Sequence, residues 1–376
     1  MKILLAAINA KYIHTNPAVY SLRAYARARV ESAEISVREF TINESDDAVL
    51  QALVREHPDV LAISTYIWNS SMADRLLPKL HELLPDTALF TGGPEVSFHT
   101  EDYLSARPYL TGVLVSEGEV TFTELVKAYE KGTVSSASLR GIPGLFLPGM
   151  KESELVLPAP LSMDDVPFFY EEWANDASLG PFAHKILYYE TSRGCPYRCS
   201  YCLSSIDKTL RYRNVDKVFR ELDFFLSRNV KQVKFIDRTF NADRLRAEKI
   251  WSYIAAHDNG ITNFHFEIAG DLLTESAVQI LSSMRPGLVQ LEIGVQSTNP
   301  ETLKSIQRTA DFRTIASFTE ALKQKHNIHQ HLDLIAGLPY EDLASFRKSF
   351  NDLMAVRPDD LQLGFLKVLK GTRMET

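Results

Sequence analysis

Residues 191–202 read Thr-Ser-Arg-Gly-Cys-Pro-Tyr-Arg-Cys-Ser-Tyr-Cys and hold all three cysteines of the chain, Cys195, Cys199 and Cys202. Their spacing is C-x3-C-x2-C, and they follow an apolar stretch at 186–191 that we expect to be a strand. Thiolates are soft ligands that select iron–sulfur clusters, zinc or copper(I). An odd, clustered set of cysteines indicates metal chemistry rather than a disulfide framework.

Three thiolates cannot complete the protein ligation of a four-iron cluster, which ordinarily takes four cysteines. Because the chain has no fourth cysteine, one iron would keep an open coordination position, as a catalytic metal centre requires. The alternative is a zinc site completed by one of the ten histidines. The cysteine spacing departs from the standard zinc spacings, so we favour the cluster.

Residues 186–376 around this segment alternate strand-like and helix-like stretches, with strands expected at 186–191, 232–237, 264–268, 289–295, 331–335 and 361–366. Within several of these strands apolar residues alternate with polar or small ones, as in Phe264-His265-Phe266-Glu267-Ile268. Strands covered on both faces would read as nearly continuous apolar runs. We therefore expect helices on one face only and a cavity on the other, as in a partial (β/α)6 TIM-like barrel. By the same alternation, Leu361, Leu363 and Phe365 should lie on the covered face.

Residues 1–132 predict a different α/β domain, with strands at 2–8, 34–40, 60–65, 88–91 and 112–115 separated by helical periodicity. Strict alternation of this kind is typical of a doubly wound, Rossmann-like (flavodoxin-like) parallel sheet that binds ligands at the carboxyl ends of its strands. Between the two domains, residues 133–185 contain six of the 17 prolines and predict a linker. The expected domains are thus 1–132, 133–185 and 186–376.

Composition narrows the class of protein. The formal net charge is -7, which lowers the expectation of nucleic-acid binding. No apolar run reaches the ~18 residues of a membrane span, and the N-terminus does not resemble a signal peptide. We expect a cytoplasmic protein without membrane association.

The motif C-x3-C-x2-C, with Tyr201 before its last cysteine, resembles the radical S-adenosylmethionine (SAM) superfamily. The resemblance implies a [4Fe-4S] cluster on Cys195, Cys199 and Cys202, whose open iron chelates SAM. It also implies cleavage of SAM to methionine and a 5′-deoxyadenosyl radical, with an electron from a donor such as flavodoxin or ferredoxin.

Further segments resemble the SAM-contacting motifs of that family at successive strand ends, namely 235–240, Glu267, 292–297 and 333–339. The segment 292–297 resembles the ribose-contacting motif of coproporphyrinogen oxidase-like and methylthiotransferase-like sequences. The resemblance implies SAM contacts for Tyr201, Asp237, Phe240, Glu267, Glu292, Gln296, Ser297, Gly337 and Leu338. It assigns no catalytic side chain.

The N-terminal half resembles the cobalamin-binding domain that precedes the radical domain in many members. The matching turns are Gly92-Gly93-Pro94-Glu95 and Ser116-Glu117-Gly118-Glu119, which implies cobalamin contacts for Gly92, Gly93, Glu117 and Gly118. The lower-ligand signature D-x-H-x-x-G is absent from residues 9–17, where His14 is out of register and is expected to be a loop hydrogen-bonder. A five-coordinate or water-ligated cobalamin, or a domain without cofactor, remains open.

We expect a cobalamin-dependent radical SAM enzyme that methylates or rearranges an unactivated carbon of a small-molecule or peptide substrate. One alternative is a methylthiotransferase-like enzyme that modifies tRNA, although the acidic balance weighs against it. Another is a non-catalytic metal-binding or electron-relay protein. The chain ends at Thr376, soon after a segment at 366–372 that resembles the sixth strand of the family, so we expect a minimal member or a truncated chain.

Overall fold

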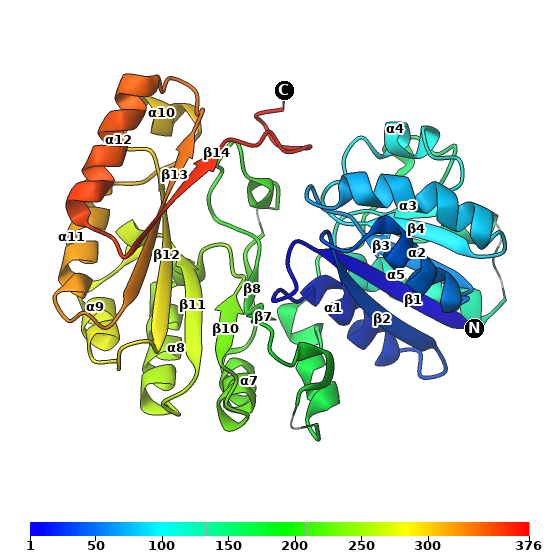
Figure 1. Ribbon diagram of the computed structural model, residues 1–376, viewed down its shortest axis with the longest axis horizontal. Coiled ribbons are helices and arrows are strands. Elements are labelled where there is room, and N and C mark those ends of the chain that lie inside the picture. Colours follow the sequence, from blue (N-terminus) through cyan, green and yellow to red (C-terminus); the bar gives the residue numbers. More distant parts are fainter. Residues whose placement is uncertain (133, 135, 177, 208, 376) are drawn as a thin grey trace. The chain divides into compact units, whose positions relative to one another are not determined.

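The computed structural model describes residues 1–132, 134, 136–176, 178–207 and 209–375. The chain forms two compact units (Figure 1). Unit 1 comprises Met1–Leu161 and Asp165–Lys185, and unit 2 comprises Ser162–Asp164 and Ile186–Thr376. The predicted boundaries at residues 133 and 376 lie outside the described residues, and the three-part division of the chain stays a prediction.

Unit 1 is built on one six-stranded sheet in the order β2-β1-β3-β4-β5-β6. Its strands are β1 (Lys2–Asn9), β2 (Glu34–Thr41), β3 (Val60–Ser64), β4 (Ala88–Gly92), β5 (Gly112–Leu114) and β6 (Leu145–Phe146). The first five are parallel, and β6 pairs antiparallel with β5. The order of the parallel strands is that of flavodoxin-like folds, so the prediction of a doubly wound sheet is confirmed.

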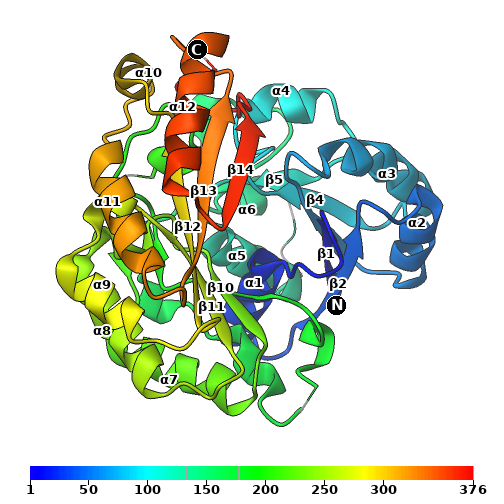
Figure 2. The same ribbon diagram turned by 60° about the vertical axis from the view of Figure 1, so that its left-hand side comes forward.

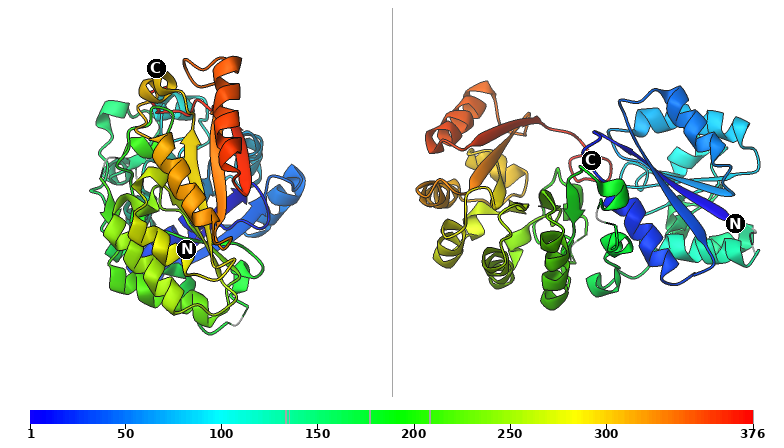
Figure 3. Two further views of the ribbon diagram at one scale, coloured as in Figure 1. Left: turned by 90° about the vertical axis from the view of Figure 1, so that its left-hand side faces the viewer. Right: turned by 60° about the horizontal axis from the view of Figure 1, so that its bottom comes forward.

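Helices cover both faces of this sheet (Figure 3). They are α1 (Pro17–Arg27), α2 (Asp46–Arg55), α3 (Ser70–Leu83), α4 (Thr100–Ser105), α5 (Gly118–Glu130) and α6 (Ser136–Arg140). Helix α1 packs with α5, and α2 packs with α3. As a result the central strand β1 is buried on both sides from Ile3 to Ile8.

The proline-rich stretch carries more structure than its composition indicated. Strand β6 and helix α6 lie in it, together with the 3₁₀ helices Glu152–Glu154, Met163–Asp165, Phe169–Trp173 and Gly180–Phe182. Leu145 and Phe146 are buried because β6 closes the edge of the unit 1 sheet beside β5. A two-residue strand flanked by prolines has too few residues to show a period, so the sequence did not reveal it.

Unit 2 contains a second six-stranded sheet, in the order β14-β13-β12-β11-β10-β7, and every pair in it is parallel. Its strands are β7 (Leu187–Tyr189), β10 (Gln232–Phe235), β11 (Asn263–Ile268), β12 (Val289–Gln296), β13 (His329–Ala336) and β14 (Asp360–Phe365). Among the described residues β7 and β14 do not pair, so the barrel stays open. The predicted parallel radical-domain sheet is confirmed.

The helices of unit 2 line the outer face of the curved sheet (Figures 2 and 3). They are α7 (Val215–Ser227), α8 (Arg244–Ala256), α9 (Glu275–Ser282), α10 (Pro300–Ser305), α11 (Phe312–Lys323) and α12 (Leu343–Val356). Along β12 buried and half-buried residues alternate without interruption, as predicted. The apolar set therefore packs under the helices, and the polar set lines the inner face.

The expected burial of the last strand was wrong. Leu363 is 49% exposed and Phe365 is 82% exposed. Strand β14 lies at the edge of the sheet, and no helix follows it among the described residues, so nothing there covers its apolar side.

Within the part of the chain that the structure describes, none of the helices combines the length and the apolar character needed to cross a bilayer.

Candidate functional site

The three cysteines lie on a long loop between β7 and α7 of unit 2. The short strands β8 (Ser192–Arg193) and β9 (Arg211–Tyr212) pair antiparallel and bring the two ends of this loop together. All three thiols are free; Cys199 is buried, and Cys195 and Cys202 are partly exposed. In the described residues no three His, Cys, Asp or Glu side chains converge as around a single ion. The loop carries the three soft donors after β7, the first strand of the unit 2 sheet.

Two polar side chains contact the thiols. The hydroxyl of Thr239 lies 3.6 Å from the sulfur of Cys195, and Arg308 Nη1 donates to the sulfur of Cys199 at 3.7 Å. Burial raises the pKa of the Cys195 thiol, which disfavours a free thiolate there. The pKa of the Arg308 guanidinium is raised although burial opposes this, because Tyr201 and Cys199 lie beside it. A cation thus lies beside the Cys199 sulfur, and a bound metal would place positive charge at all three sulfurs.

Sequence reasoning missed Arg308. Its second nitrogen donates to the carbonyl of Gly294 on β12, so the guanidinium links the cysteine loop to the inner face of the sheet. It follows α10 on a loop without a distinctive pattern, and no spacing rule pointed to it.

The inner face of the sheet carries a cluster of charged side chains from three neighbouring strands. Lys234 Nζ on β10 lies 3.2 Å from Glu267 Oε1 on β11 and 2.9 Å from Glu292 Oε2 on β12. His265 Nε2 lies 3.0 Å from the same Glu292 oxygen. Burial works to raise the pKa of Glu292, but His265 and Lys234 together lower it to about 2. Glu292 is therefore ionised, and the structure brings the predicted pair Glu267 and Glu292 together on one lysine.

Beside this cluster on β13 lie His331 and Asp333, whose Nε2 and Oδ1 atoms are 3.1 Å apart. Burial, followed by the negative charges of Glu292 and Glu267, raises the pKa of Asp333 to about 7. Burial also lowers the pKa of His331. On this partly buried face, beside the negative charges of Glu292 and Glu267, the ionised form of a further carboxylate is consequently disfavoured near neutral pH.

Asp237 and Phe240, predicted to contact SAM, both lie after β10 and are nearly inaccessible to solvent. The Asp237 carboxylate accepts hydrogen bonds from the backbone N–H groups of Thr191 and Ser192. Burial raises the pKa of Asp237 to about 6, although these donors work to lower it. Phe240 packs with Phe266 in the aromatic core under the helices, at a ring-centroid distance of 4.4 Å. Contact of either side chain with SAM stays a prediction.

The predicted residues at the end of β12 lie at an irregular strand end. The pairing register with β13 shifts between Gly294 and Gln296, and Gln296 has a left-handed φ of 70°. Such a bulge re-aims side chains and is frequent beside functional sites. Ser297 is buried, and its hydroxyl donates to Glu341 at 2.5 Å.

Three further predicted residues lie close to the cysteine loop or at the end of β13. Leu338 forms a buried cluster with Leu303 and Ile306, and Tyr201 packs against that cluster. Gly337, with a φ of 91°, turns the chain after β13. Tyr201 and Leu338 thus pack the cysteine loop against the end of β13, and the contacts of all three residues with SAM stay predictions.

The predicted cobalamin residues all lie at the carboxyl edge of the unit 1 sheet, after β4 and β5. Gly93 has a φ of 111°, and a Cβ there would lie 2.5 Å from the carbonyl oxygen of Thr65, so the backbone itself requires glycine. At Gly118 a Cβ would lie 2.9 Å from Leu22 Cδ2, which allows α1 and α5 to pack closely. Gly92 ends β4, and Glu117 precedes α5. Their contact with cobalamin stays a prediction.

The loop after β1, where the absent histidine motif would lie, is fixed by a carboxylate. Glu39 accepts hydrogen bonds from Asn9 Nδ2, the backbone of Asn16 and the hydroxyl of Tyr20. Lys185 Nζ pairs with it at 2.8 Å, and both side chains of that pair are only 8% exposed. This loop is therefore rigidly attached to β2 without any metal.

Comparison with known proteins agrees with both halves of this description. Residues 189–353 match the model of the Radical SAM superfamily, and residues 3–126 match the B12 binding domain. The chain belongs to the radical SAM superfamily. More narrowly, it is one of the members that carry a B12 binding domain ahead of the radical domain, and its relatives include radical SAM methyltransferases.

The cobalamin-dependent radical SAM methyltransferase TokK of Streptomyces tokunonensis is 26% identical over 351 residues, which is 85% of this chain and 48% of TokK. The 2-(S-pantetheinyl)-carbapenam-3-carboxylate methyltransferase of Streptantibioticus cattleyicolor is 24% identical over 341 residues, 85% of this chain and 48% of that protein. The chain thus spans about half the length of these curated relatives.

Among solved structures, the radical SAM methyltransferase TsrM from Kitasatospora setae, with cobalamin and a [4Fe-4S] cluster bound, superposes with a TM-score of 0.77. The match covers 100% of this chain and 74% of TsrM at 17% identity. At that identity the likeness establishes the fold.

Proposed function

We propose that the protein is a cobalamin-dependent radical SAM enzyme that methylates an unactivated carbon of its substrate. The observation that carries the proposal is that one chain contains two candidate ligand-binding regions, each at the carboxyl end of a parallel sheet. Three free cysteines lie on the loop after β7, above an inner sheet face lined by polar side chains. The second region is the carboxyl edge of the doubly wound sheet of unit 1.

The residues present fit the implied groups. Cys195, Cys199 and Cys202 would hold a [4Fe-4S] cluster and leave one iron open, because the chain has no fourth cysteine. Arg308, buried beside Cys199, is the cation available to a carboxylate at that open position. When bound, the cluster and SAM supply the radical that removes a substrate hydrogen, and cobalamin supplies a methyl group.

The chain's own residues would position the substrate and SAM and shield them from water. Glu267 and Glu292 are held in place by Lys234 on the inner face of the sheet, next to the bulge at Gln296. Their carboxylates can accept hydrogen bonds from hydroxyl or amino groups of a bound ligand. The helices outside the sheet exclude water from its apolar side. Substrate positioning of this kind contributes to catalysis without any acid or base being assigned.

At the carboxyl edge of the unit 1 sheet, Trp68 stacks on Tyr66 with ring centroids 4.3 Å apart, and 45% of Trp68 is exposed. Its indole nitrogen donates to the carbonyl of Ile8 at the end of β1. A fixed, exposed aromatic surface beside Gly93 is suited to a large planar ligand such as cobalamin.

The partners in this proposal are a small-molecule or peptide substrate and a one-electron donor such as flavodoxin or ferredoxin. Radical SAM enzymes generally require such a donor.

The test is SAM cleavage by anaerobically reconstituted protein under a chemical reductant. The full chain should form 5′-deoxyadenosine, whereas Cys199→Ala should lower its formation by at least 10³-fold, on the order of the loss of an essential catalytic group. Equal product from both proteins, or none from either when iron is fully loaded, would contradict the proposal.

A further inference from the structure

The cysteine loop has little regular structure of its own. Between β8 and β9 it contains the single 3₁₀ helix Leu203–Ser205 among the described residues. The positions of the cysteines therefore depend on how firmly the two ends of the loop are held. Those ends meet where Arg213 N donates to the carbonyl of Thr191 at 2.8 Å.

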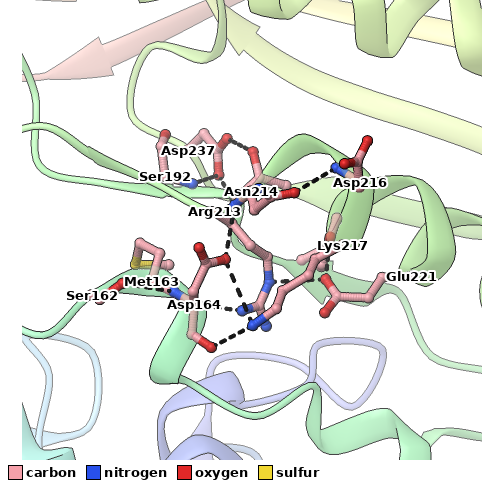
Figure 4. Close-up of polar contacts among 12 residues, drawn as sticks. Ser162, Met163, Asp164, Ser192, Arg213, Asn214, Asp216, Lys217, Glu221 and Asp237 are labelled. Atoms are coloured by element: carbon pink, nitrogen blue, oxygen red, sulfur yellow. Dashed lines mark hydrogen bonds and ion pairs between the residues drawn. The ribbon is translucent and has the colours of Figure 1, made fainter.

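The incoming end of the loop is held by Asp237, which lies beside Ser192 in Figure 4. One carboxylate oxygen accepts from Thr191 N at 2.6 Å and Ser192 N at 3.0 Å, and the other accepts from the Thr191 hydroxyl. Asp237 is 1% exposed. Both oxygens are thus already used by three donors of the loop, within a site that water does not reach.

The outgoing end is held by two guanidinium groups, that of the buried Arg213 and that of the partly buried Arg246. Arg246 Nη2 donates to the carbonyls of Thr191 and Arg213, at 3.2 and 3.0 Å, and so joins both ends. Arg213 donates through Nε to Glu221 at 2.9 Å and through Nη1 to the carbonyl of Met163 at 2.5 Å (Figure 4). Arg213 and Glu221 thus form a buried ion pair, and the Arg246 guanidinium interacts electrostatically with Asp237.

The segment that carries Asp237 also contacts a cysteine directly. Thr239, two residues later, places its hydroxyl 3.6 Å from Cys195 Sγ. The loop after β10 therefore touches the cysteine loop twice, once at its base and once at a candidate ligand. Any shift at the base would be transmitted to that sulfur through a rigid two-residue connection.

We propose that Asp237 is a positioning residue for the cluster, which it orients through Thr191 and Ser192, rather than a ligand of SAM. The inference rests on the proposed function, because it needs a cluster on the three cysteines. Without the carboxylate, three buried donors lose their acceptor, and the loop relaxes to find others. Partners of metal ligands that are disturbed in this way typically weaken metal retention.

The test compares three isosteric variants of the full chain after anaerobic reconstitution. Asp237→Asn puts an amide against the loop N–H groups, and Thr191→Val removes one donor while leaving the charge in place. The matched control is Glu248→Gln, since Glu248 also accepts two hydroxyl hydrogen bonds, from Thr274 and Ser276, at a position away from the loop. Two quantities are measured: the rate of iron loss to a chelator, and the electron paramagnetic resonance signal and midpoint potential of the clusters that remain.

We expect Asp237→Asn to lose iron roughly 10- to 100-fold faster than the unmodified protein. Its remaining clusters should have a higher midpoint potential, because a nearby negative charge has been removed. Thr191→Val should speed iron loss by less and leave the midpoint potential nearly unchanged, because the carboxylate charge remains. Glu248→Gln should change neither quantity. A merely structural role would lower folding stability without moving the potential of an intact cluster.

Iron retention and potential in Asp237→Asn equal to those of Glu248→Gln would overturn the proposal. Should Asp237→Asn fail to fold, the rate of iron loss from Thr191→Val decides the question: a rate equal to that of Glu248→Gln would overturn the proposal. Neither readout needs SAM turnover. A protein that holds its cluster but does not cleave SAM would therefore contradict the proposed function and leave this inference standing.

Discussion

Both sheets of the protein have six strands, all parallel in unit 2 and parallel except for β6 in unit 1, yet they bury their side chains differently. In β1 of unit 1 consecutive residues from Ile3 to Ile8 are buried, whereas in β12 of unit 2 every second residue is half-exposed. Helices cover the first sheet on both faces and the second on one (Figure 3). The first sheet can therefore offer ligands only its carboxyl edge, while the second also offers an inner face.

The largest expected effect is on the free energy of unfolding, and it tests this contrast at neighbouring residues of one strand from each sheet. In β1, Leu4→Ala and Leu5→Ala should each lower the free energy of unfolding by about 2–5 kcal/mol, because both neighbours are fully buried. In β12, Leu291→Ala should cost a similar amount, whereas the adjacent Gln290→Ala should cost about 0.5 kcal/mol or less. Denaturant unfolding of the four variants measures this. A costly Gln290→Ala would show that the inner face is packed rather than open.

A second prediction concerns the polarity of the inner face. The pKa of Asp333 is raised from 3.8 to about 7, so the folded protein holds that proton more tightly than the unfolded chain. The associated stability is present below pH ~4 and is lost as the pH rises toward ~7. Asp333→Asn should abolish this loss, with a gain over the unmodified protein on the order of 3 kcal/mol above pH ~7.

The control for that experiment is a carboxyl group whose pKa is shifted in the opposite direction. Asp352 on α12 has a lowered pKa, which burial opposes and the hydrogen bonds from Lys348 and Thr298 produce. Asp352→Asn should therefore lower stability at neutral pH and lose its effect as the medium becomes acidic. Thermal unfolding between pH ~2.5 and 8 distinguishes the two, because the Asp352 contribution is lost only below pH ~4. Parallel pH curves for Asp333→Asn and the unmodified protein would refute the account of the inner face.

The smallest expected effect is one in which the two units should not differ. Ser45 caps α2 in unit 1 by accepting from Ala48 N at 3.2 Å, and Thr274 caps α9 in unit 2 by accepting from Ala277 N at 2.9 Å. Alanine at either position should cost about 1 kcal/mol. Thr274→Ala should cost slightly more, since its hydroxyl also donates to Glu248. Losses of similar size in denaturant unfolding would confine the contrast between the units to their sheets, and a loss several times larger in one unit would contradict it.

Strand positions and faces were predictable where the pattern is long. The alternation in 264–268 and 289–295 predicted the buried and inner faces of β11 and β12. The cluster site that the cysteine spacing indicates stays a prediction. Lys234 could have been found as well, since it lies between the buried Val233 and Phe235 and so shares the parity of Glu267.

Other features depend on tertiary contacts that leave no local pattern. Arg308 reaches Cys199 across 109 residues, and Asp237 is turned toward Thr191 rather than into the cavity. The sequence of a strand end does not show whether an aspartate there points toward a neighbouring loop or toward a ligand. The exposure of Phe365 likewise depends on what covers β14, not on its alternation.

The measurement that tests the central claim most directly is the electron paramagnetic resonance spectrum of the anaerobically reconstituted, reduced chain, recorded with and without SAM. The account predicts about four iron atoms per chain on the three cysteines and a signal that changes when SAM binds to the open iron. A protein that holds zinc at these cysteines, or an iron signal that SAM leaves unaltered, would contradict it.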